Sequence, residues 1–376
     1  MRELKIFFVV VFFTGLVYWG VEPFAHSVMN PPSTPVTFNF AKADEEFLKQ
    51  EIITKTKALE EIKTSGNEKA IMNSQKALDT AIQREEQVKQ IWDKVSKIDF
   101  SKGDAKKGRE IFEGNCIACH GIKAAGIPAS ITDSSSFGVT PPDLSDAGDI
   151  YDEKFLAALI IDPVNAMQIS HKFNDEKPFV MPAYPLSGDE TQDNNDLANL
   201  IAFLKNTATN YEKDFEAKLK VQLEKKYAKK QDLSDTDKAA LIVKEINFAK
   251  DKQVFENACG RCHDVKYDGF VSSSNMSDLK NYLGIIPPDL SMMIRSKGEH
   301  YLNIFINEPQ KKIHGTAMPR VGLNEKSQTQ VINYLEKVGD SKKEEREKTG
   351  IYVMIFFVIL SIFAIGWKRT IWSKLH

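Results

Sequence analysis

Two five-residue motifs, each with two cysteines followed by a histidine, constrain this chain more than any other feature. The first is CIACH at residues 116–120 and the second is CGRCH at residues 259–263. In a C-x-x-C-H motif the two thiols form thioethers to a porphyrin and the adjacent histidine ligates its iron, so the motif attaches a c-type haem. We therefore expect two covalently bound haem c groups. The residues expected to hold them are Cys116, Cys119 and His120, and then Cys259, Cys262 and His263.

The number of cysteines supports this interpretation. The chain has 376 residues and 4 cysteines, and all of them belong to the two motifs, so none is left for a disulfide or a reactive thiol. Zinc is the alternative for paired C-x-x-C motifs, but zinc ribbons place the pairs about 15–20 residues apart. Here the two pairs begin 143 positions apart. This spacing favours haem over zinc.

Each motif begins a longer series of elements that occurs twice in the same order. A Pro-Pro-Asp-Leu-Ser stretch follows at residues 141–145 and again at 287–291, and a Met-Pro pair follows at 181–182 and again at 318–319. Three elements that recur in one order at similar spacing indicate an internal repeat. We therefore predict two related domains, each of about a hundred residues or fewer.

A helix is predicted on either side of each series. Residues 104–113 and 196–205 bracket the first series, and residues 328–338 close the second; Phe112 and Phe255 each lie four residues before a motif. This arrangement resembles the class I cytochromes c, in which a helix before the haem motif packs against a helix after the methionine. The resemblance covers both domains and implies an all-α fold.

The histidine in each motif is predicted to be the proximal iron ligand, which assigns that role to His120 and His263. Neutral imidazole ligates iron through one nitrogen, and its other N–H needs an acceptor that fixes the ring. In class I cytochromes c a proline carbonyl is this acceptor. The resemblance therefore implies that Pro142 and Pro288 serve here, although either Pro-Pro pair could also be a plain rigid turn.

The opposite axial ligand is predicted to be Met181 in the first domain and Met318 in the second, because each precedes a proline and a closing helix. Methionine ligation raises the reduction potential of a haem, which suits a relay, and bis-histidine ligation is the main alternative. His171 and His314 are the strongest competitors. The other candidates are Met167 in the first domain and Met276, Met292, Met293 and His300 in the second.

Two apolar segments suggest where the domains are located. Residues 6–21 follow Arg2 and Lys5, and residues 351–367 precede Lys368. At 16 and 17 residues, both segments are near the lower limit for a membrane-spanning helix, but their basic flanks and aromatic ends fit one. We therefore expect one transmembrane helix at each end of the chain.

Each apolar segment has an alternative interpretation. The first could be a cleaved signal peptide, but residues 23–25 (PFA) make a poor cleavage site. The second could be a buried core helix, but the charged run at 341–349 argues against it. The positive-inside rule then places both termini in the cytoplasm. The haem domains are expected in the periplasm, on the outer face of a bacterial inner membrane.

The expected fold is all-α, with two class I cytochrome c-like haem domains joined by helical linkers and one transmembrane helix at each end. Residues 43–98 have apolar positions at helical spacing, interrupted at 64–67, which predicts two antiparallel helices. We favour a solvated spacer over a docking arm for a partner subunit, because the apolar stripe is thin. The predicted parts are an anchor (1–24) with a proline-rich connector after it (30–35), a helical spacer (25–100), cytochrome c domain 1 (101–210), a helical linker (211–245), cytochrome c domain 2 (246–340) and a second anchor (341–376).

The expected chemistry is outer-sphere electron transfer. The sequence contains no evident nucleophile–base pair, phosphate loop or open metal site, and with both axial positions filled neither iron could readily bind a substrate. The net charge of −2 gives no indication of nucleic-acid binding. The chain is therefore expected to relay electrons and not to be a catalyst by itself.

The second domain resembles a particular family. Residues 287–291 are followed by Ile294, Arg295, Gly298 and Tyr301. This pattern is similar to the membrane-anchored cytochrome c subunit of cytochrome bc complexes, in which Pro-Pro-Asp-Leu-Ser leads into an A-R-x-G-x-x-Y-like helix. Ile294 replaces the family's usual alanine. The resemblance implies that a methionine followed by proline is the sixth ligand and that one carboxy-terminal helix anchors the protein. It also implies a cofactor-binding role for Arg295.

A second haem and an amino-terminal anchor depart from the single-haem pattern of that family. They resemble the dihaem form of some bacterial bc complexes, which are quinol–cytochrome c reductases. The resemblance implies cytochrome b and Rieske iron–sulfur subunits as partners, and a periplasmic cytochrome c or a terminal oxidase as acceptor. Two other functions remain open. The dihaem subunit of a cbb-type oxidase is anchored at its amino end only, and a dihaem peroxidase is typically soluble with one open iron.

The charges of the two domains suggest an order of electron flow. Residues 101–206 carry 9 Lys and Arg against 16 Asp and Glu, whereas residues 246–340 carry 12 against 11. Complementary charge steers encounter, so the acidic first domain suits a basic carrier cytochrome, although acidity could also serve solubility alone. The second domain precedes the last anchor. Our hypothesis is quinol to Rieske centre, then the haem at His263, then the haem at His120.

Overall fold

The structure is a computed structural model, and it describes residues 2–22, 24–25, 38–64, 66–173 and 177–375. Within these ranges the chain forms helices and loops and has no β-strand, only three isolated β-bridges. The expectation of an all-α fold is therefore confirmed.

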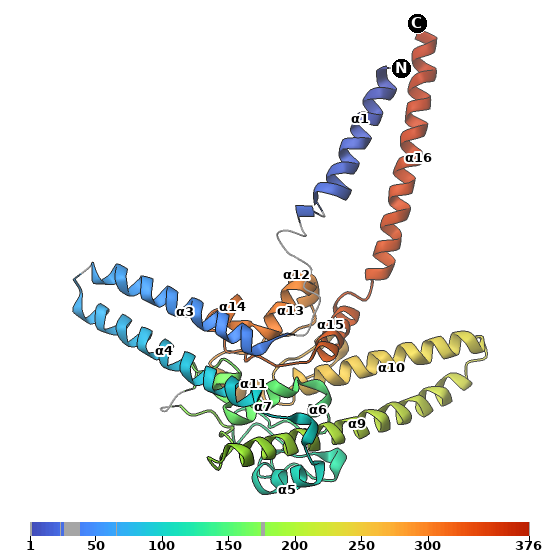
Figure 1. Ribbon diagram of the computed structural model, residues 1–376. Coiled ribbons are helices and arrows are strands. Elements are labelled where there is room, and N and C mark those ends of the chain that lie inside the picture. Colours follow the sequence, from blue (N-terminus) through green and yellow to red (C-terminus); the bar gives the residue numbers. More distant parts are fainter. Residues whose placement is uncertain (1, 23, 26–37, 65, 174–176, 376) are drawn as a thin grey trace.

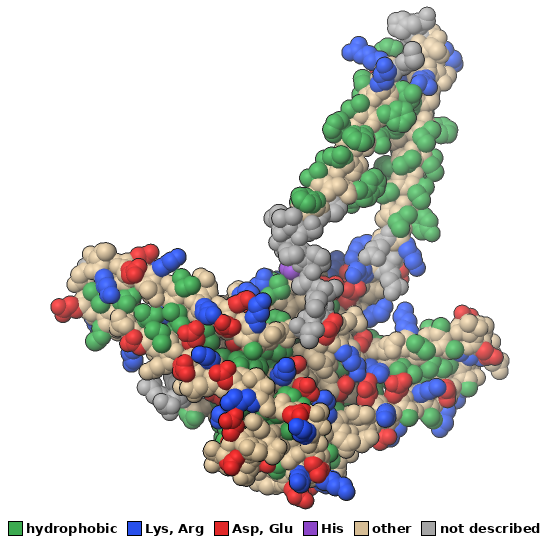
Figure 2. All heavy atoms as spheres, in the orientation of Figure 1, with side chains coloured by type: hydrophobic (Ala, Val, Ile, Leu, Met, Phe, Trp, Pro, Cys, Tyr) green, Lys and Arg blue, Asp and Glu red, His purple; other side chains and the backbone are tan. Residues whose placement is uncertain are grey.

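Two long apolar helices extend from the body of the molecule, and both chain ends lie at their far end (Figure 1). They are α1 (Arg2–Leu16), which continues into a π-helical turn η1 (Val17–Val21), and α16 (Lys343–Leu375). Their apolar spans are entirely unburied, and apolar side chains cover both of them (Figure 2). An ion pair of 2.9 Å between Lys368 Nζ and Glu3 Oε2 joins the far ends. The two helices are consistent with membrane anchoring; the expected connector at 30–35 lies outside the described residues.

The first domain is built on a crossing of two helices. Helix α5 (Ala105–Asn115) lies across the first half of α9 (Glu190–Ala228). Phe112 is buried there against Phe203, with ring centroids 5.8 Å apart. Gly108 permits the close approach, since a β-carbon on it would lie 1.9 Å from the carbonyl oxygen of Asn199. The segments between the two helices are η3 (Lys123–Ala125), α6 (Ala147–Ile150), α7 (Glu153–Ile161) and α8 (Pro163–Ala166), while η2 (Phe100–Lys102) precedes them.

The second domain repeats this crossing with α10 (Asp235–Ala258) and α15 (Glu325–Gly339). Phe255 takes the place of Phe112, and its ring lies 4.8 Å from that of Tyr334; both side chains are fully buried. The segments in between are η4 (Lys266–Asp268), α11 (Met276–Leu283), α12 (Met293–Lys297), α13 (Glu299–Asn307) and α14 (Pro309–Lys312).

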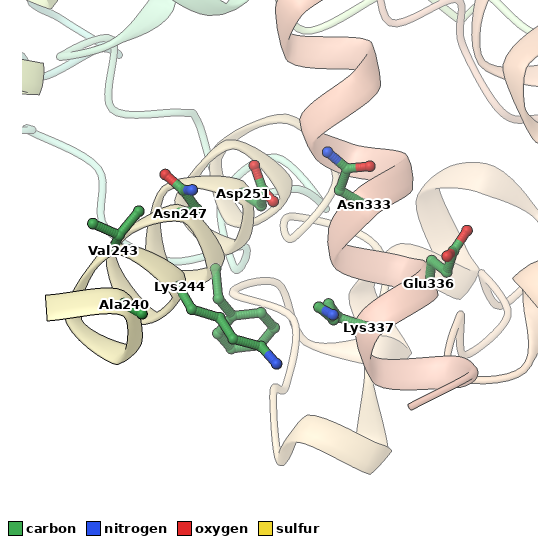
Figure 3. Close-up of a pocket in the computed structure, with 9 residues that line it drawn as sticks. Ala240, Val243, Lys244, Asn247, Asp251, Asn333, Glu336 and Lys337 are labelled. Atoms are coloured by element: carbon green, nitrogen blue, oxygen red, sulfur yellow. The ribbon is translucent and has the colours of Figure 1, made fainter. Parts of the chain in front are cut away.

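The two crossings differ at one position. Asp251 precedes Phe255 by four residues, as Gly108 precedes Phe112 in the first domain. Next to it, a groove of about 420 Å³ separates α10 from α15, and Asp251 and Asn333 lie on its facing helices (Figure 3). Partial burial raises the pKa of the Asp251 carboxyl to about 6. The glycine that permits the close crossing in the first domain is therefore replaced by an aspartate beside a groove in the second.

The two domains are connected by long helices with no break at the expected boundaries. The helix expected at 196–205 and the start of the helical linker expected at 211–245 form one continuous α9, because residues 190–228 contain neither glycine nor proline. Ser234 caps α10 by accepting a hydrogen bond from the amide of Asp237. The positions 210/211 and 245/246 therefore lie inside helices, and the outer ends of α9 and α10 pack through Leu223, Tyr227 and Ile246.

A helical hairpin precedes the first domain, as the sequence predicts. Its helices are α3 (Phe40–Lys63) and α4 (Glu68–Ser96). The base of the hairpin belongs to the core, since Phe40 contacts Phe155 of α7 at 5.1 Å and Val95 is only 2% exposed. The expectation of a solvated spacer is therefore wrong for the base. The thin apolar stripe is sufficient there because it faces an apolar helix, α7.

The close crossing in the first domain leads to a stability prediction. We expect Gly108→Ala to destabilise the protein by about 1–3 kcal/mol, because the added methyl group overlaps the backbone of α9. Thermal or denaturant unfolding of the two variants would measure this. The control is Gly114→Ala in the same helix, where nothing lies within 4 Å of the new β-carbon. It should be neutral or stabilising by up to about 1 kcal/mol; equal losses in both variants would contradict the packing argument.

Candidate haem-binding sites

The first motif forms a tight turn at the end of α5. The helix ends at Cys116, whose amide donates to the carbonyl of Phe112 at 2.8 Å. The amide of His120 then donates back to the carbonyl of Cys116 at 2.9 Å. This turn directs the imidazole inward, where its Nδ1 lies 3.1 Å from the carbonyl oxygen of Pro142.

The second motif has the same geometry at the end of α10. The amide of Cys259 donates to Phe255 at 2.8 Å, and the amide of His263 donates to Cys259 at 3.1 Å. The Nδ1 atom of His263 lies 2.8 Å from the carbonyl oxygen of Pro288. The structure therefore brings together the motif and the proline of each domain in the same way.

These contacts set the protonation of both imidazoles. A carbonyl oxygen can only accept, so Nδ1 of each ring must carry the proton. Burial, as the main cause, lowers the pKa of His120 and of His263, which keeps both rings neutral at neutral pH. A neutral imidazole protonated at Nδ1 leaves the lone pair of Nε2 available. Each site can thus offer Nε2 to an iron atom.

The four cysteines are free thiols. Burial, as the main cause, raises the pKa of Cys116 to about 11 and that of Cys259 to about 12, and it also raises the pKa of Cys262. The raised pKa favours the protonated thiol in these three cysteines, and none of the four is joined in a disulfide. Two reduced thiols beside a neutral histidine fit a covalently attached haem.

The Pro-Pro-Asp-Leu-Ser stretch fixes the loop that carries the proline carbonyl. In the first domain, Asp143 accepts from the amide of Lys123 at 3.2 Å, and Ser145 accepts from the amide of Ala124 at 3.0 Å. In the second domain, Asp289 and Ser291 accept from the amides of residues 266 and 267 at 3.0 and 3.1 Å. Sequence reasoning missed this role, although the repeated Asp-x-Ser was the signal for it.

The predicted methionines lie in irregular loops. Met181 lies between α8 and α9, and Met318 between α14 and α15; both are partly buried. In the second of these loops, the amide of Met318 donates a hydrogen bond to Thr316 Oγ1 at 3.3 Å. Their roles as iron ligands stay predictions.

The competing residues occupy different surroundings. His171 is exposed, and its Nε2 lies 3.0 Å from the carbonyl oxygen of Thr316 in the second domain, so it points away from the first motif's domain. His314 is exposed, and so is Arg295 on α12, which the sequence predicts to bind the cofactor. Of the remaining candidates, Met276 begins α11, Met292 is 43% exposed, Met293 packs against the core of the second domain, His300 lies in α13 and Met167 packs beside α8.

The two sites meet at an interface between the domains. The amide of Thr140, two residues before Pro142, donates to Ser274 Oγ at 2.9 Å, and its hydroxyl donates to the carbonyl of Ser273 at 3.1 Å. Ser134 donates to Asp278 of α11 at 2.7 Å. Residues of the second domain therefore hold the loop that positions the His120 imidazole.

Two further residues of the second domain reach the first site. The ring of Tyr282 lies 5.1 Å from that of Phe173, and a β-carbon on Gly138 would lie 2.7 Å from the Cβ of Tyr282. Burial is the main cause of the lowered pKa of His120, and the positive charge of Arg261, inside the second motif, lowers it further. The charge of Arg261 therefore acts on the first site. Its buried Nε atom has no hydrogen-bond partner among the described residues. The second motif thus places a positive charge within electrostatic reach of the first site.

Two helical domains, each with a C-x-x-C-H turn and a histidine held by a proline carbonyl, define a c-type cytochrome. A family model for cytochrome c matches residues 105–208 and 248–339, which together make up more than half of the chain. The chain belongs to the cytochrome c family. Membership implies covalently bound haem c, and the residues of both sites fit such a group.

Comparisons with individual proteins overlap only part of the chain. A cytochrome c-553-like protein of Synechocystis sp. is 56% identical over 32 residues, which are 8% of this chain and 30% of the length of that protein. A chain of a hyperthermophilic respiratory Complex III is 19% identical, with a TM-score of 0.28. That match covers 35% of this chain and 77% of the other.

The predicted axial ligands can be tested by spectroscopy. If both haems have methionine ligation, the oxidised protein should show a weak near-infrared sulfur-to-iron band from each. Replacing Met181 or Met318 by alanine should remove about half of this band, because one of two thioether ligands is lost. The band should be unchanged in His171→Ala and His314→Ala. Loss of the band in a histidine variant, with the methionine variants unchanged, would reassign the ligand.

Proposed function

We propose that this chain is the dihaem c-type cytochrome subunit of a respiratory quinol–cytochrome c reductase. It would relay electrons from the Rieske iron–sulfur protein to a periplasmic cytochrome c or a terminal oxidase. Its cofactors would be two haem c groups, attached at Cys116 and Cys119 and at Cys259 and Cys262. Bound haem c supplies one-electron redox chemistry, and the protein supplies its binding, its orientation and its electrostatic surroundings.

The observation that carries this proposal is the shared interface of the two sites. Ser274 and Asp278 of the second domain brace the loop of the first site, and Arg261 of the second motif acts electrostatically on His120. Because residues of the second domain brace the loop of the first site, the two sites belong to one packed body. This arrangement supports electron transfer from one site to the other inside a single body.

The site residues have distinct roles in the proposal. His120 and His263 would ligate iron through Nε2, while Pro142 and Pro288 hold their Nδ1 protons. The methionine loops would supply the opposite ligand. A neutral imidazole and a thioether add no charge to the iron, and thioether ligation raises its potential. A pair of such sites suits a high-potential relay and not a substrate-binding centre.

The proposed location is a bacterial inner membrane, with the haem domains in the periplasm and both termini in the cytoplasm. Support comes from α1 and α16, which leave the body in the same direction and bring both termini to one end (Figure 1). Basic side chains gather at that end (Figure 2), where the sequence of the two helices has Arg2, Lys5, Lys368 and Arg369. The positive-inside rule assigns this side to the cytoplasm.

The proposed partners are cytochrome b and the Rieske protein, on the basis of the resemblance of the second domain to the bc-complex cytochrome. A cbb-type oxidase subunit would need no carboxy-terminal anchor, whereas α16 is a 33-residue helix with an unburied apolar span. A dihaem peroxidase would need an iron with a free or displaceable axial position. The fixed relay geometry favours the first of these three functions.

Co-purification would separate the three functions. We expect the detergent-solubilised chain, captured by an affinity tag on a loop, to retain cytochrome b and a Rieske protein, because its two anchors and second domain face those partners in the proposal. Mass spectrometry and haem spectra of the captured complex would identify them. A catalytic subunit with copper and haem would indicate the oxidase instead, and a preparation without partners that consumes hydrogen peroxide would indicate the peroxidase.

The order of electron flow can be tested in the complete complex. With Cys116 and Cys119 replaced by alanine, quinol should still reduce the haem at His263 rapidly in stopped-flow measurements, but transfer to the acceptor should fail. The reason is that the acidic first domain is the proposed docking surface for a basic carrier. The matched variant replaces Cys259 and Cys262. Rapid reduction of the haem at His120 in that variant would reverse the order or show that the haems fill in parallel.

A further inference from the structure

A buried ion pair lies beside the loop that carries Met318. Arg320 follows Met318 by two residues, and its side chain is completely buried. Its guanidinium Nη1 contacts Asp44 Oδ1 at 2.7 Å, and its Nε donates to the carbonyl of Asn307 at 2.8 Å. Asp44 belongs to α3 of the helical hairpin, 276 positions away in the sequence. The hairpin therefore reaches the second haem site directly.

Asp44 is a junction of three parts of the chain. Its carboxylate, 2% exposed, also accepts from Trp92 Nε1 of the hairpin and from Gln168 Nε2 of the first domain, each at 2.8 Å. The amide of Arg320 donates to the carbonyl of Met167 at 3.0 Å. The hairpin, the first domain and the methionine loop of the second domain thus converge on one carboxylate.

The backbone at this junction is constrained. Gln168 is the non-glycine residue with a positive φ, +57°, among the described residues. A side chain in this left-handed region persists where the surroundings hold it. Here the side chain of Gln168 is held by its hydrogen bond to Asp44. The carbonyl of the preceding residue, Met167, accepts the hydrogen bond from the amide of Arg320.

Burial makes the Asp44–Arg320 ion pair sensitive to the loss of either partner. A buried ion pair offsets its desolvation only when further hydrogen bonds satisfy the remaining groups, and the loss of one partner leaves an uncompensated charge. The carboxylate of Asp44 has three donors. Arg320 uses Nη1 and Nε, while its buried Nη2 has no hydrogen-bond partner among the described residues, and its guanidinium carbon lies 5.5 Å from the ring centroid of Phe40 on α3. These contacts fix the position of the Arg320 side chain. They also restrict the backbone near Met318, which lies two residues earlier.

The two sides of the Met318 loop are held by different contacts. On the amino-terminal side, Gln310 Nε2 donates to the carbonyl of Thr316 at 2.8 Å, and the amide of Gly315 donates to Gln310 Oε1 at 2.9 Å. On the carboxy-terminal side, Arg320 fixes the chain through Asp44, Asn307 and Met167. The sulfur position of a loop methionine depends on both sides.

We propose that Asp44 and Arg320 are positioning residues for Met318, so that the amino-terminal hairpin holds the sixth ligand of the second haem in place. This inference rests on the proposed function, because it takes Met318 as an iron ligand. The hairpin then has a role at a redox site, beyond that of a spacer or a docking arm. Weakening the pair should loosen the ligand without preventing haem attachment, because Cys259, Cys262 and His263 lie on other segments.

The test uses the full-length protein with both haems attached. In Asp44→Asn, we expect loss of about half of the near-infrared sulfur-to-iron band, since one of two thioether ligands is released. The reduced variant should bind carbon monoxide at one of its haems, whereas the wild-type protein should bind none. Haem content should remain unchanged. Asp44→Glu, which keeps the carboxylate, should recover more of the band than Asp44→Asn.

The control is Glu51→Gln in the same helix. Glu51 forms an ion pair of 2.6 Å with Arg84 inside the hairpin, separate from Arg320. It should lose stability without changing the band or binding carbon monoxide. If Asp44→Asn folds poorly, the double variant Asp44→Leu/Arg320→Met replaces the pair by apolar side chains and leaves no unpaired charge. The same spectral changes are expected in it.

The outcomes separate the inference from the proposed function. A full band and no carbon monoxide binding in Asp44→Asn, or in the double variant, would overturn the positioning role. A full band in Met318→Ala would show that Met318 is not a ligand. In that case the ligand assignment itself would be wrong, whatever the result for Asp44→Asn. Equal spectral changes in Glu51→Gln and Asp44→Asn would mean that the hairpin acts by general stability alone, which also overturns the inference.

Discussion

The hydrogen bond between each motif histidine and a proline carbonyl is the contact on which the rest of this structure depends. It fixes the tautomer and the direction of the imidazole, and it requires the Pro-Pro loop to return to the C-x-x-C-H turn. That return is secured by an aspartate and a serine that accept hydrogen bonds from backbone amides just after each motif. The packing of the opening helix on the closing helix then brackets the site. Each domain is thus organised outward from one imidazole.

The two domains use the same local design but depend on different neighbours. The Pro-Pro loop of the first domain is held through Thr140 by Ser274 of the second domain. The methionine loop of the second domain is held through Arg320 by Asp44 of the hairpin. An internal repeat is normally expected to give two equivalent units, each complete by itself. Here each unit is completed by a segment outside it, so the hairpin and both domains form one body.

Local features of this chain could be predicted from the sequence, and long-range contacts could not. The motifs, the all-α fold, the Ser234 cap and the helices at either side of each motif follow from residue type and spacing, which act over a few residues. The continuous α9 was missed, because a change from apolar to charged composition suggested a boundary where no helix-breaking residue exists. The core contacts of the hairpin and the Asp44–Arg320 pair were also missed. The Asp44–Arg320 pair joins residues 276 positions apart, and a single charged residue gives no sign of its partner.

The position of Arg261 has an electrostatic consequence for the pair of sites. This arginine belongs to the second motif, and its positive charge also acts on His120 of the first. A fixed positive charge stabilises the reduced form of a neighbouring haem, since reduction adds a negative charge, and burial strengthens the effect. With haem at both sites, this charge would favour the reduced form of each. The electrostatic surroundings of His120 are therefore a property of the assembled molecule, because the first domain alone would lack Arg261.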